Sequence, residues 1–236
     1  QNFAEAQEAH SNLILDQIPD GTQRILDVGS GSGNLALKLI NKGFQVDCVI
    51  PSEFLAEQVR AKLGVHSKIH TCGFENVTAD ASYDLILFSE SFQYVKLRES
   101  LQKIADMLNP NGYLLICDFF RRDVPGKSPM GGGHSWQGFQ DTITKHPLNL
   151  VTDMDITEDT APTIDLLAKF NTDVVTPIVE MSGEYLTDHY PRLTKLLIWK
   201  FKKRLDKIHN IYLSGAVNGG SFKKFKEYHF LVYERR

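Results

Sequence analysis

The segment that most clearly carries chemistry is Ile25–Asn34, which reads ILDVGSGSGN. Its three glycines, Gly29, Gly31 and Gly33, are separated by serines and follow an acid, Asp27. Glycine permits sharp turns and lets a ligand approach the backbone closely. Three alternate glycines behind an acid exceed what a turn alone needs, so we interpret the segment as a ligand-binding loop. The structural alternative is that the glycines only close a turn between a strand and a helix.

The charge and the spacing of this loop indicate the kind of ligand. A dinucleotide-binding GxGxxG pattern has its third glycine at the sixth position, which Asn34 holds here. The carboxylate of Asp27 would repel a pyrophosphate, whereas it suits the ammonium group of an amino-acid moiety. The sequence has no GxxxxGK[ST] pattern, so a phosphate-cradling loop is not indicated.

The elements that position this loop follow from hydrophobic periodicity over residues 1–155. Strands are expected at Arg24–Val28, Gln45–Ile50, Lys68–Cys72, Tyr83–Phe88, Tyr113–Asp118 and Leu148–Met154, and helices at Asn34–Asn41, Glu53–Lys62 and Leu97–Leu108. This alternation predicts right-handed crossovers and a mostly parallel sheet, with the glycine loop at its carboxyl edge. The Asn-Pro-Asn-Gly sequence at 109–112 is expected to end the third helix.

The pattern changes after residue 155. Residues 156–222 predict two or three helices and no strand, and EYHFLVY at 227–233 predicts a last strand. We therefore expect one α/β domain in three parts: a core at 1–155, an inserted helical cap at 156–222, and the final strand of the core within 223–236.

Composition excludes several classes of protein. The 236 residues are 42% hydrophobic and 23% charged, which excludes disordered, collagen-like and coiled-coil chains. No apolar run approaches the roughly 18 residues of a membrane-spanning helix. The three dispersed cysteines exclude a disulfide scaffold and argue against a structural zinc site, so we expect no metal. The cysteines also fit a reducing compartment, so we expect a cytoplasmic location, and because the chain begins with Gln1 and shows no signal-peptide pattern we expect it to be trimmed or processed.

The charge is unevenly distributed along the chain. The net charge of −3 argues against a nucleic-acid partner. Residues 151–190 carry nine acids against Lys169, whereas residues 191–212 carry seven bases against Asp206. The basic segment interleaves aromatic side chains with lysines, which is compatible with peripheral contact to an anionic membrane. We favour the alternative of a cap helix whose basic side faces solvent or pairs with the acidic segment.

Three segments, in the correct order and spacing, resemble one known family. ILDVGSGSG at 25–33 resembles motif I of the class I S-adenosylmethionine-dependent methyltransferases. YDLILFSESFQYV at 83–95 resembles the family's fourth strand and loop, and LQKIADMLNPNGYLLICD at 101–118 its next helix, turn and fifth strand. The chain is similar to the group that acts on small molecules, lipids and isoprenoids, including sterol, tocopherol and geranyl diphosphate methyltransferases. The resemblance implies an α/β, Rossmann-like, seven-stranded, mostly parallel sheet, with an antiparallel last strand and a helical cap inserted before it.

The resemblance also implies S-adenosylmethionine as cofactor, with S-adenosylhomocysteine as product. Ile50 stands where the family usually has the acid that binds the ribose, with Asp47 and Glu53 as substitutes, and Gly73 replaces the acid of the third strand. Ser52 would then face the ribose or adenine. The cofactor-binding residues that the resemblance implies are Asp27, Gly29, Ser30, Gly31, Gly33, Ile50, Pro51, Ser52, Gly73, Phe74, Ser89 and Glu90.

Methyl transfer is an in-line displacement, in which the protein mainly aligns the nucleophile and excludes water. Glu90 and Tyr94 are candidates to orient the substrate, with backbone hydrogen bonding and packing as the alternatives. His134 is the candidate general base because an imidazole ordinarily titrates near neutral pH, although a loop histidine is more often solvent-exposed. The candidates for a substrate pocket are Phe119, Phe120, Arg121 and Trp136, with core packing and surface solvation as the alternatives.

These observations together predict a methyltransferase that acts on a small, apolar acceptor: a lipid, an isoprenoid or a natural product. The absence of an evident catalytic dyad favours an acceptor that is intrinsically nucleophilic or already ionised. Two other classes stay open, a nucleotide-dependent oxidoreductase and a catalytically silent methyltransferase-like binding protein. The sequence does not fix the acceptor atom or the oligomeric state.

Overall fold

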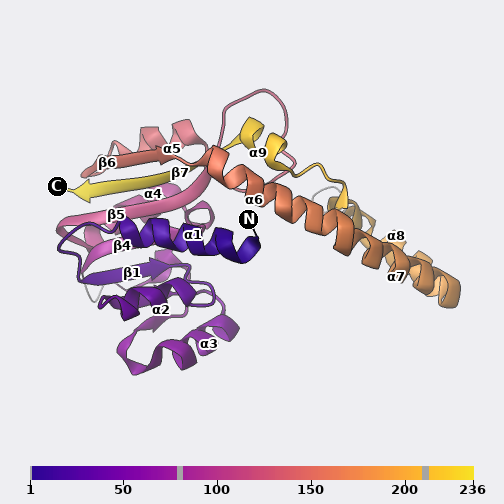
Figure 1. The fold of residues 1–236 in the computed structure, drawn as a ribbon, viewed down its shortest axis with the longest axis horizontal. Helices are drawn as coiled ribbons and strands as arrows, with labels where there is room; N and C mark the ends of the chain where they lie inside the picture. Colours follow the sequence, from indigo (N-terminus) through magenta and orange to yellow (C-terminus); the bar gives the residue numbers. More distant parts are fainter. Residues whose placement is uncertain (1, 79–81, 209–212) are drawn as a thin grey trace. The chain divides into compact units, whose positions relative to one another are not determined.

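The core of the chain is a single β-sheet. The computed structural model describes residues 2–78, 82–208 and 213–236. Within them the strands are β1 (Arg24–Val28), β2 (Gln45–Val49), β3 (Ile69–His70), β4 (Tyr83–Ser89), β5 (Leu108–Arg121), β6 (Leu148–Asp155) and β7 (Lys226–Arg235). They lie in the order β3-β2-β1-β4-β5-β7-β6, as Figure 1 shows for the larger strands. The five strands β1 to β5 are parallel, and β7 runs antiparallel to β5 and β6. The predicted Rossmann-like sheet, mostly parallel with an antiparallel last strand, is confirmed.

Helices cover both faces of this sheet. They are α1 (Phe3–Asp16), α2 (Asn34–Asn41), α3 (Glu53–Leu63), α4 (Leu97–Met107) and α5 (Trp136–Ile143). Adjacent residues of a strand point to opposite faces. Ile116 of β5 packs in the core cluster that α4 and α5 share, whereas the next residue, Cys117, lies against His10 of α1. Helix α1 therefore covers the face opposite to α4 and α5.

Three features of the sheet unit differ from the prediction. Strand β5 begins at Leu108, which pairs with Tyr83, so that the Asn-Pro-Asn-Gly sequence lies inside the strand as an irregularity. Asn111 takes a φ of 61° there, a conformation that asparagine tolerates. Helices α1 and α5 were not predicted, because α1 buries only Ile14 completely and α5 is a short helix of eight residues.

A second compact unit comprises Thr157–Phe225 together with 1–3 and 124–131. Its helices are α6 (Thr157–Phe170), a π-helical turn (Asn171–Val175), α7 (Thr176–His189), α8 (Pro191–Ile208) and α9 (Gly219–Phe225). Asp165 accepts a hydrogen bond from the backbone N–H of Gly219, with Oδ1 2.7 Å from the nitrogen, and this bond joins α6 to α9. Four α-helices thus occupy the described part of the segment in which we expected two or three.

The second unit exposes an unusual amount of apolar surface. Of the 25 exposed large hydrophobic residues among the described ones, 18 lie between Leu166 and Ile208. Trp199, on the basic side of α8, is 77% exposed. Of the bases from Arg192 to Arg204, none forms an ion pair with an acid of 158–190 among the residues that the structure describes. The basic side of α8 is therefore solvated rather than paired. No helix in the described ranges is both long and apolar enough to cross a bilayer.

Candidate active site

The glycine loop connects β1 to α2, as predicted. Gly29, Gly31 and Gly33 all take positive φ values, 80°, 54° and 75°. A Cβ on Gly29 would lie 2.4 Å from the Cβ of Ser91, and one on Gly33 would lie 3.1 Å from Val59. A Cβ on Gly31 would meet nothing within 4 Å. Gly29 and Gly33 therefore serve the packing of the loop against its neighbours, whereas a Cβ on Gly31 would face open space.

Asp27 is a buried carboxyl group without a full set of partners. It is 2% exposed, and its Oδ2 atom has no hydrogen-bond partner among the described residues. Burial raises the pKa of Asp27 to about 7. A buried, unpaired carboxylate is costly unless a cation or a donor meets it. The unpaired carboxyl group of Asp27 thus fits the ammonium end of an amino-acid ligand, and the implied cofactor has such a group.

The candidate residues in and after β2 for the place of the missing ribose-binding acid differ in their surroundings. Ile50 is buried, and Ser52 caps α3 by accepting a hydrogen bond from the Leu55 N–H, with Oγ 3.4 Å from the nitrogen. Asp47 accepts hydrogen bonds from the Arg24 guanidinium (2.8 Å) and from the Tyr83 hydroxyl (2.9 Å). The suggestion that Asp47 substitutes for the acid is therefore wrong, because its carboxylate is occupied inside the sheet.

Two neighbouring residues complete this side of the site. Glu53 forms an exposed ion pair with Arg60, at 2.8 Å, so it is accessible but already partnered. Pro51 lies exposed between β2 and α3. Ribose recognition through Pro51 and Ser52 stays a prediction.

The side chain of Phe74 lies in the core, so only its backbone is left for the adenine recognition that we expect from backbone groups near Gly73 and Phe74. Its side chain is buried, and its ring meets that of Phe88 edge to face, with the ring centroids 5.4 Å apart. Such aromatic pairs stabilise a core by about 1 kcal/mol. Adenine recognition by backbone groups near Gly73 stays a prediction, and a direct contact with the Phe74 side chain is excluded.

The carboxyl end of β4 holds a group of polar side chains. Register pairs Val28 of β1 with Phe88 of β4, so the next residue, Ser89, lies beside the glycine loop. The Ser89 hydroxyl is 2.9 Å from Nε2 of His10, which comes from α1. Glu90 follows with a φ of 55°, and its Oε1 accepts a hydrogen bond from the hydroxyl of Tyr228, 3.2 Å away.

His10 was not predicted as a site residue. It lies 79 residues from Ser89, so no local motif connects them. Helical spacing could have indicated its position: His10 lies one turn before Ile14, so both side chains face the sheet. Tyr94, in contrast, is 79% exposed, so its side chain points mostly into solvent.

His134 links two loops. Its Nε2 is 3.0 Å from the backbone carbonyl oxygen of Phe92, and its own carbonyl accepts a hydrogen bond from the Arg121 N–H, at 2.7 Å. Because a carbonyl oxygen only accepts, Nε2 carries the proton and donates it. Burial lowers the pKa of His134, so the neutral ring persists. This geometry favours a structural role for His134, and Nε2 is not available as a general base.

The predicted aromatic pocket divides between the two faces of β5. Phe120 is buried against Phe139 of α5, with ring centroids 4.9 Å apart, and Trp136 stacks on His229 at 4.0 Å. Phe120 and Trp136 thus both belong to the aromatic core between α5 and the sheet, and their assignment to a substrate pocket is not supported. Phe119 faces the other way and lies under the ammonium group of Lys226, 5.0 Å from the ring centroid. Of the four predicted pocket residues, Arg121 alone is exposed.

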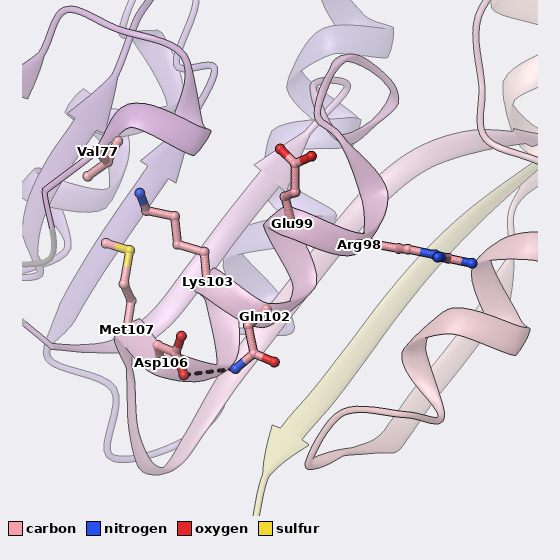
Figure 2. Close-up of a pocket in the computed structure, with 7 residues that line it drawn as sticks. All are labelled: Val77, Arg98, Glu99, Gln102, Lys103, Asp106 and Met107. Atoms are coloured by element: carbon pink, nitrogen blue, oxygen red, sulfur yellow. Dashed lines mark hydrogen bonds between the residues drawn. The ribbon is translucent and has the colours of Figure 1, made fainter.

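A shallow depression along α4 lies apart from these residues. Figure 2 shows its lining, in which the Gln102 side chain donates a hydrogen bond to Asp106, at 3.0 Å. The lining residues are Val77, Arg98, Glu99, Gln102, Lys103, Asp106 and Met107. None of them belongs to the glycine loop or to the end of β4, so we assign this depression no part in the site.

Comparison with known proteins agrees with this geometry. The profile of the methyltransferase domain family matches residues 25–112, which include the glycine loop, β4 and its following loop. This match covers less than half of the chain. The predicted enzyme class, an S-adenosylmethionine-dependent methyltransferase, is confirmed.

Individual relatives show how far the likeness extends. An uncharacterized methyltransferase of Staphylococcus carnosus is 26% identical over 167 residues, which is 68% of this chain and 80% of that protein. The chain spans about half the length, or less, of several other curated methyltransferases that it matches.

Solved structures share the fold along nearly the whole chain. Geranyl diphosphate C-methyltransferase from Streptomyces coelicolor has a TM-score of 0.69 at 16% identity, over 98% of this chain and 79% of that one. The [4+2]-cyclase SpnF has a TM-score of 0.70 at 15% identity, over 100% of this chain and 83% of that one. The two names show that this fold alone does not determine the reaction.

Proposed function

We propose that the chain transfers the methyl group of S-adenosylmethionine to a small, apolar acceptor, such as a lipid, an isoprenoid or a natural product. Two observations carry the cofactor assignment: a Cβ on Gly31 would meet nothing within 4 Å, and Oδ2 of buried Asp27, four residues earlier in the same segment, has no hydrogen-bond partner among the described residues. The fold shared with a geranyl diphosphate C-methyltransferase supports the choice of acceptor class.

When bound, S-adenosylmethionine supplies an electrophilic methyl group on a sulfonium centre. The task of the protein is then to bind the methionine end and to align an acceptor. The backbone N–H of Gly29 donates to the carbonyl of Val49, at 2.8 Å, which fixes the start of the loop. Ser91 donates to the carbonyl of Val28, so the loop is also held from the side of β4. Asp27, which precedes this loop, would bind the ammonium group.

Calorimetry tests the cofactor assignment. We expect S-adenosylmethionine and S-adenosylhomocysteine to bind, and NADH, the ligand of the oxidoreductase alternative, not to bind. Titration to about 1 mM detects even an interaction of roughly −4 kcal/mol. Absence of heat with both adenosyl compounds at that concentration, or saturable binding of NADH, would overturn the proposal.

Radioactive methyl transfer tests the acceptor class. The protein is incubated with S-adenosyl-[methyl-³H]methionine and a small-molecule extract, and the product is partitioned between water and an organic solvent. We expect enzyme-dependent label in the organic phase. Label confined to the aqueous phase would contradict an apolar acceptor, and cofactor binding without any transfer would support the silent binding protein.

A further inference from the structure

The pair formed by His10 and Ser89 lies at the carboxyl edge of the sheet, beside the glycine loop. Ser89 ends β4 next to the glycine loop that follows β1, and ligands of such sheets bind outside the carboxyl ends of the strands. His10 reaches the same edge from α1, with Nε2 2.9 Å from the Ser89 hydroxyl oxygen. Both side chains are half-buried, so a substrate group has access to the pair.

The surroundings of the ring indicate which nitrogen carries the proton. Nδ1 of His10 is 3.9 Å from Sγ of Cys117, and Nε2 faces Ser89. A hydroxyl is a good donor and a thiol a weak one, so Ser89 donating to Nε2 is the stronger arrangement. Nδ1–H then points to the Cys117 sulfur, which accepts weakly. In this tautomer the lone pairs of the Ser89 oxygen are left for a hydroxyl of the substrate.

Two other titratable groups at this edge, Cys117 and Tyr228, do not compete for a proton near neutral pH, whereas burial raises the pKa values of Asp27 and Asp118 to about 7. Burial is the main reason why the pKa values of the Cys117 thiol and the Tyr228 hydroxyl are raised, so both stay protonated. Burial lowers the pKa of His10, and the nearby carboxylate of Glu90 raises it in part. Glu90 also accepts the hydrogen bond of Tyr228 and so stays at the edge.

We propose that His10, acting through Ser89, accepts the proton of a hydroxyl group on the methyl acceptor. The acceptor would then be an alcohol or a phenol that is methylated on oxygen, rather than an alkene that is methylated on carbon. This proposal rests on the proposed methyltransferase function. It also replaces the expectation of an acceptor that needs no base, because the structure brings together a dyad that the sequence does not reveal.

The step balances in atoms and charge. The acceptor oxygen forms a bond to the methyl carbon, and the carbon–sulfur bond breaks with its electron pair left on sulfur. The hydroxyl proton passes to the Ser89 oxygen as the Ser89 proton passes to Nε2 of His10. The resulting imidazolium lies near the carboxylate of Glu90, which stabilises it. A base is needed because alcohols and phenols keep their protons at neutral pH.

The tautomer of His10 provides a test that needs no acceptor. The ¹⁵N resonances of the ring are measured at neutral pH in protein saturated with S-adenosylhomocysteine, and they are assigned by their loss in His10→Gln. We expect a neutral ring with the proton on Nδ1. A proton on Nε2 would overturn the proposal, because that nitrogen could not then accept the proton of Ser89.

Methyl transfer tests the role directly. Wild type and variants are given S-adenosyl-[methyl-³H]methionine with either a pool of simple phenols and long-chain alcohols or geranyl diphosphate. We expect label on the hydroxyl pool, with a loss of about 10²-fold or more in His10→Gln and Ser89→Ala. His146→Gln is the matched control, since His146 precedes β6 at the opposite edge of the sheet. S-adenosylhomocysteine affinity should change less than about twofold in His10→Gln and in His146→Gln.

Different results would refute the methyltransferase function and the proton-acceptor role of His10. If wild type binds no S-adenosylhomocysteine, the methyltransferase function itself is wrong. If binding is intact and label goes only to geranyl diphosphate, or His10→Gln transfers methyl as fast as wild type, the proton-acceptor role is wrong and the methyltransferase function stands.

Discussion

Replacement of Gly31 separates a ligand-binding loop from a merely structural turn. At a φ of 54°, an L-residue is strained by roughly 1–2 kcal/mol, but no protein atom lies within 4 Å of the added Cβ. Gly31→Ala should therefore fold with a modest loss of stability. For a chain of 236 residues, 1 kcal/mol corresponds to a shift in melting temperature of about 2–4 °C.

The matched control is Gly21→Ala. Gly21 also has a positive φ, 83°, and open space around its Cβ, but it lies in the turn between α1 and β1. The two alanine variants should lose similar stability, because the backbone strain is similar. Their effects on cofactor binding should differ, since Gly31 belongs to the glycine loop and Gly21 does not.

Calorimetry with S-adenosylhomocysteine measures the difference. We expect Gly31→Ala to weaken binding at least tenfold, which corresponds to about 1.4 kcal/mol, and Gly31→Val to abolish it. Gly21→Ala should bind within about twofold of wild type. If Gly31→Val binds with wild-type affinity, the loop is structural and the reasoning from its geometry is refuted.

Four further outcomes are expected. Gly29→Ala should destabilise the protein more than Gly31→Ala in denaturant titrations, because its Cβ would overlap a neighbouring side chain at 2.4 Å. The raised pKa of Asp27, about 7, means that the folded state keeps a proton that the unfolded state loses. Unfolding free energy of the ligand-free protein should therefore fall from pH 4 to pH 7, and Asp27→Asn should flatten this part of the profile; a rise in wild type contradicts the assignment. His134→Ala should lower stability by about 1 kcal/mol and turnover by less than about tenfold, whereas a larger loss of turnover would support a base. The chain should bind vesicles of anionic lipid at low salt and dissociate from them at high salt. The double variant Trp199→Ser, Lys202→Glu should weaken this binding. Equal binding to neutral vesicles would contradict a role for the basic side of α8.

The sequence predicts most of the sheet because its central strands are buried on both faces. β1 and α2 begin and end at the predicted residues, since an apolar run followed by glycines leaves little choice of boundary. The start of β5 is less predictable. Proline and glycine at 110 and 112 indicate a turn, but pairing of Leu108 with Tyr83 extends the strand across it.

The site is predicted only where its residues are close in sequence. The glycine loop and Asp27 are one continuous motif, and the structure places them together. Phe119 and Phe120 are adjacent at a strand end, and sequence does not tell which of the two faces the core. His10 comes to the site from another helix, so only the packing of α1 on the sheet reveals it.

The assignment of a reaction to this chain depends on the edge of the sheet at β4. The glycine loop specifies a cofactor, and a [4+2]-cyclase with a TM-score of 0.70 shows that different reactions share this fold. What distinguishes one such enzyme from another is the set of groups that meets the acceptor. Both His10 and His134 lie near this edge, but Nε2 of His134 donates to a carbonyl and has no free lone pair. Nε2 of His10 faces a hydroxyl, which can donate to it. The hydrogen-bond partner of each ring therefore decides which of its nitrogens is able to take up a proton: Nε2 in His10, through Ser89, and only Nδ1 in His134.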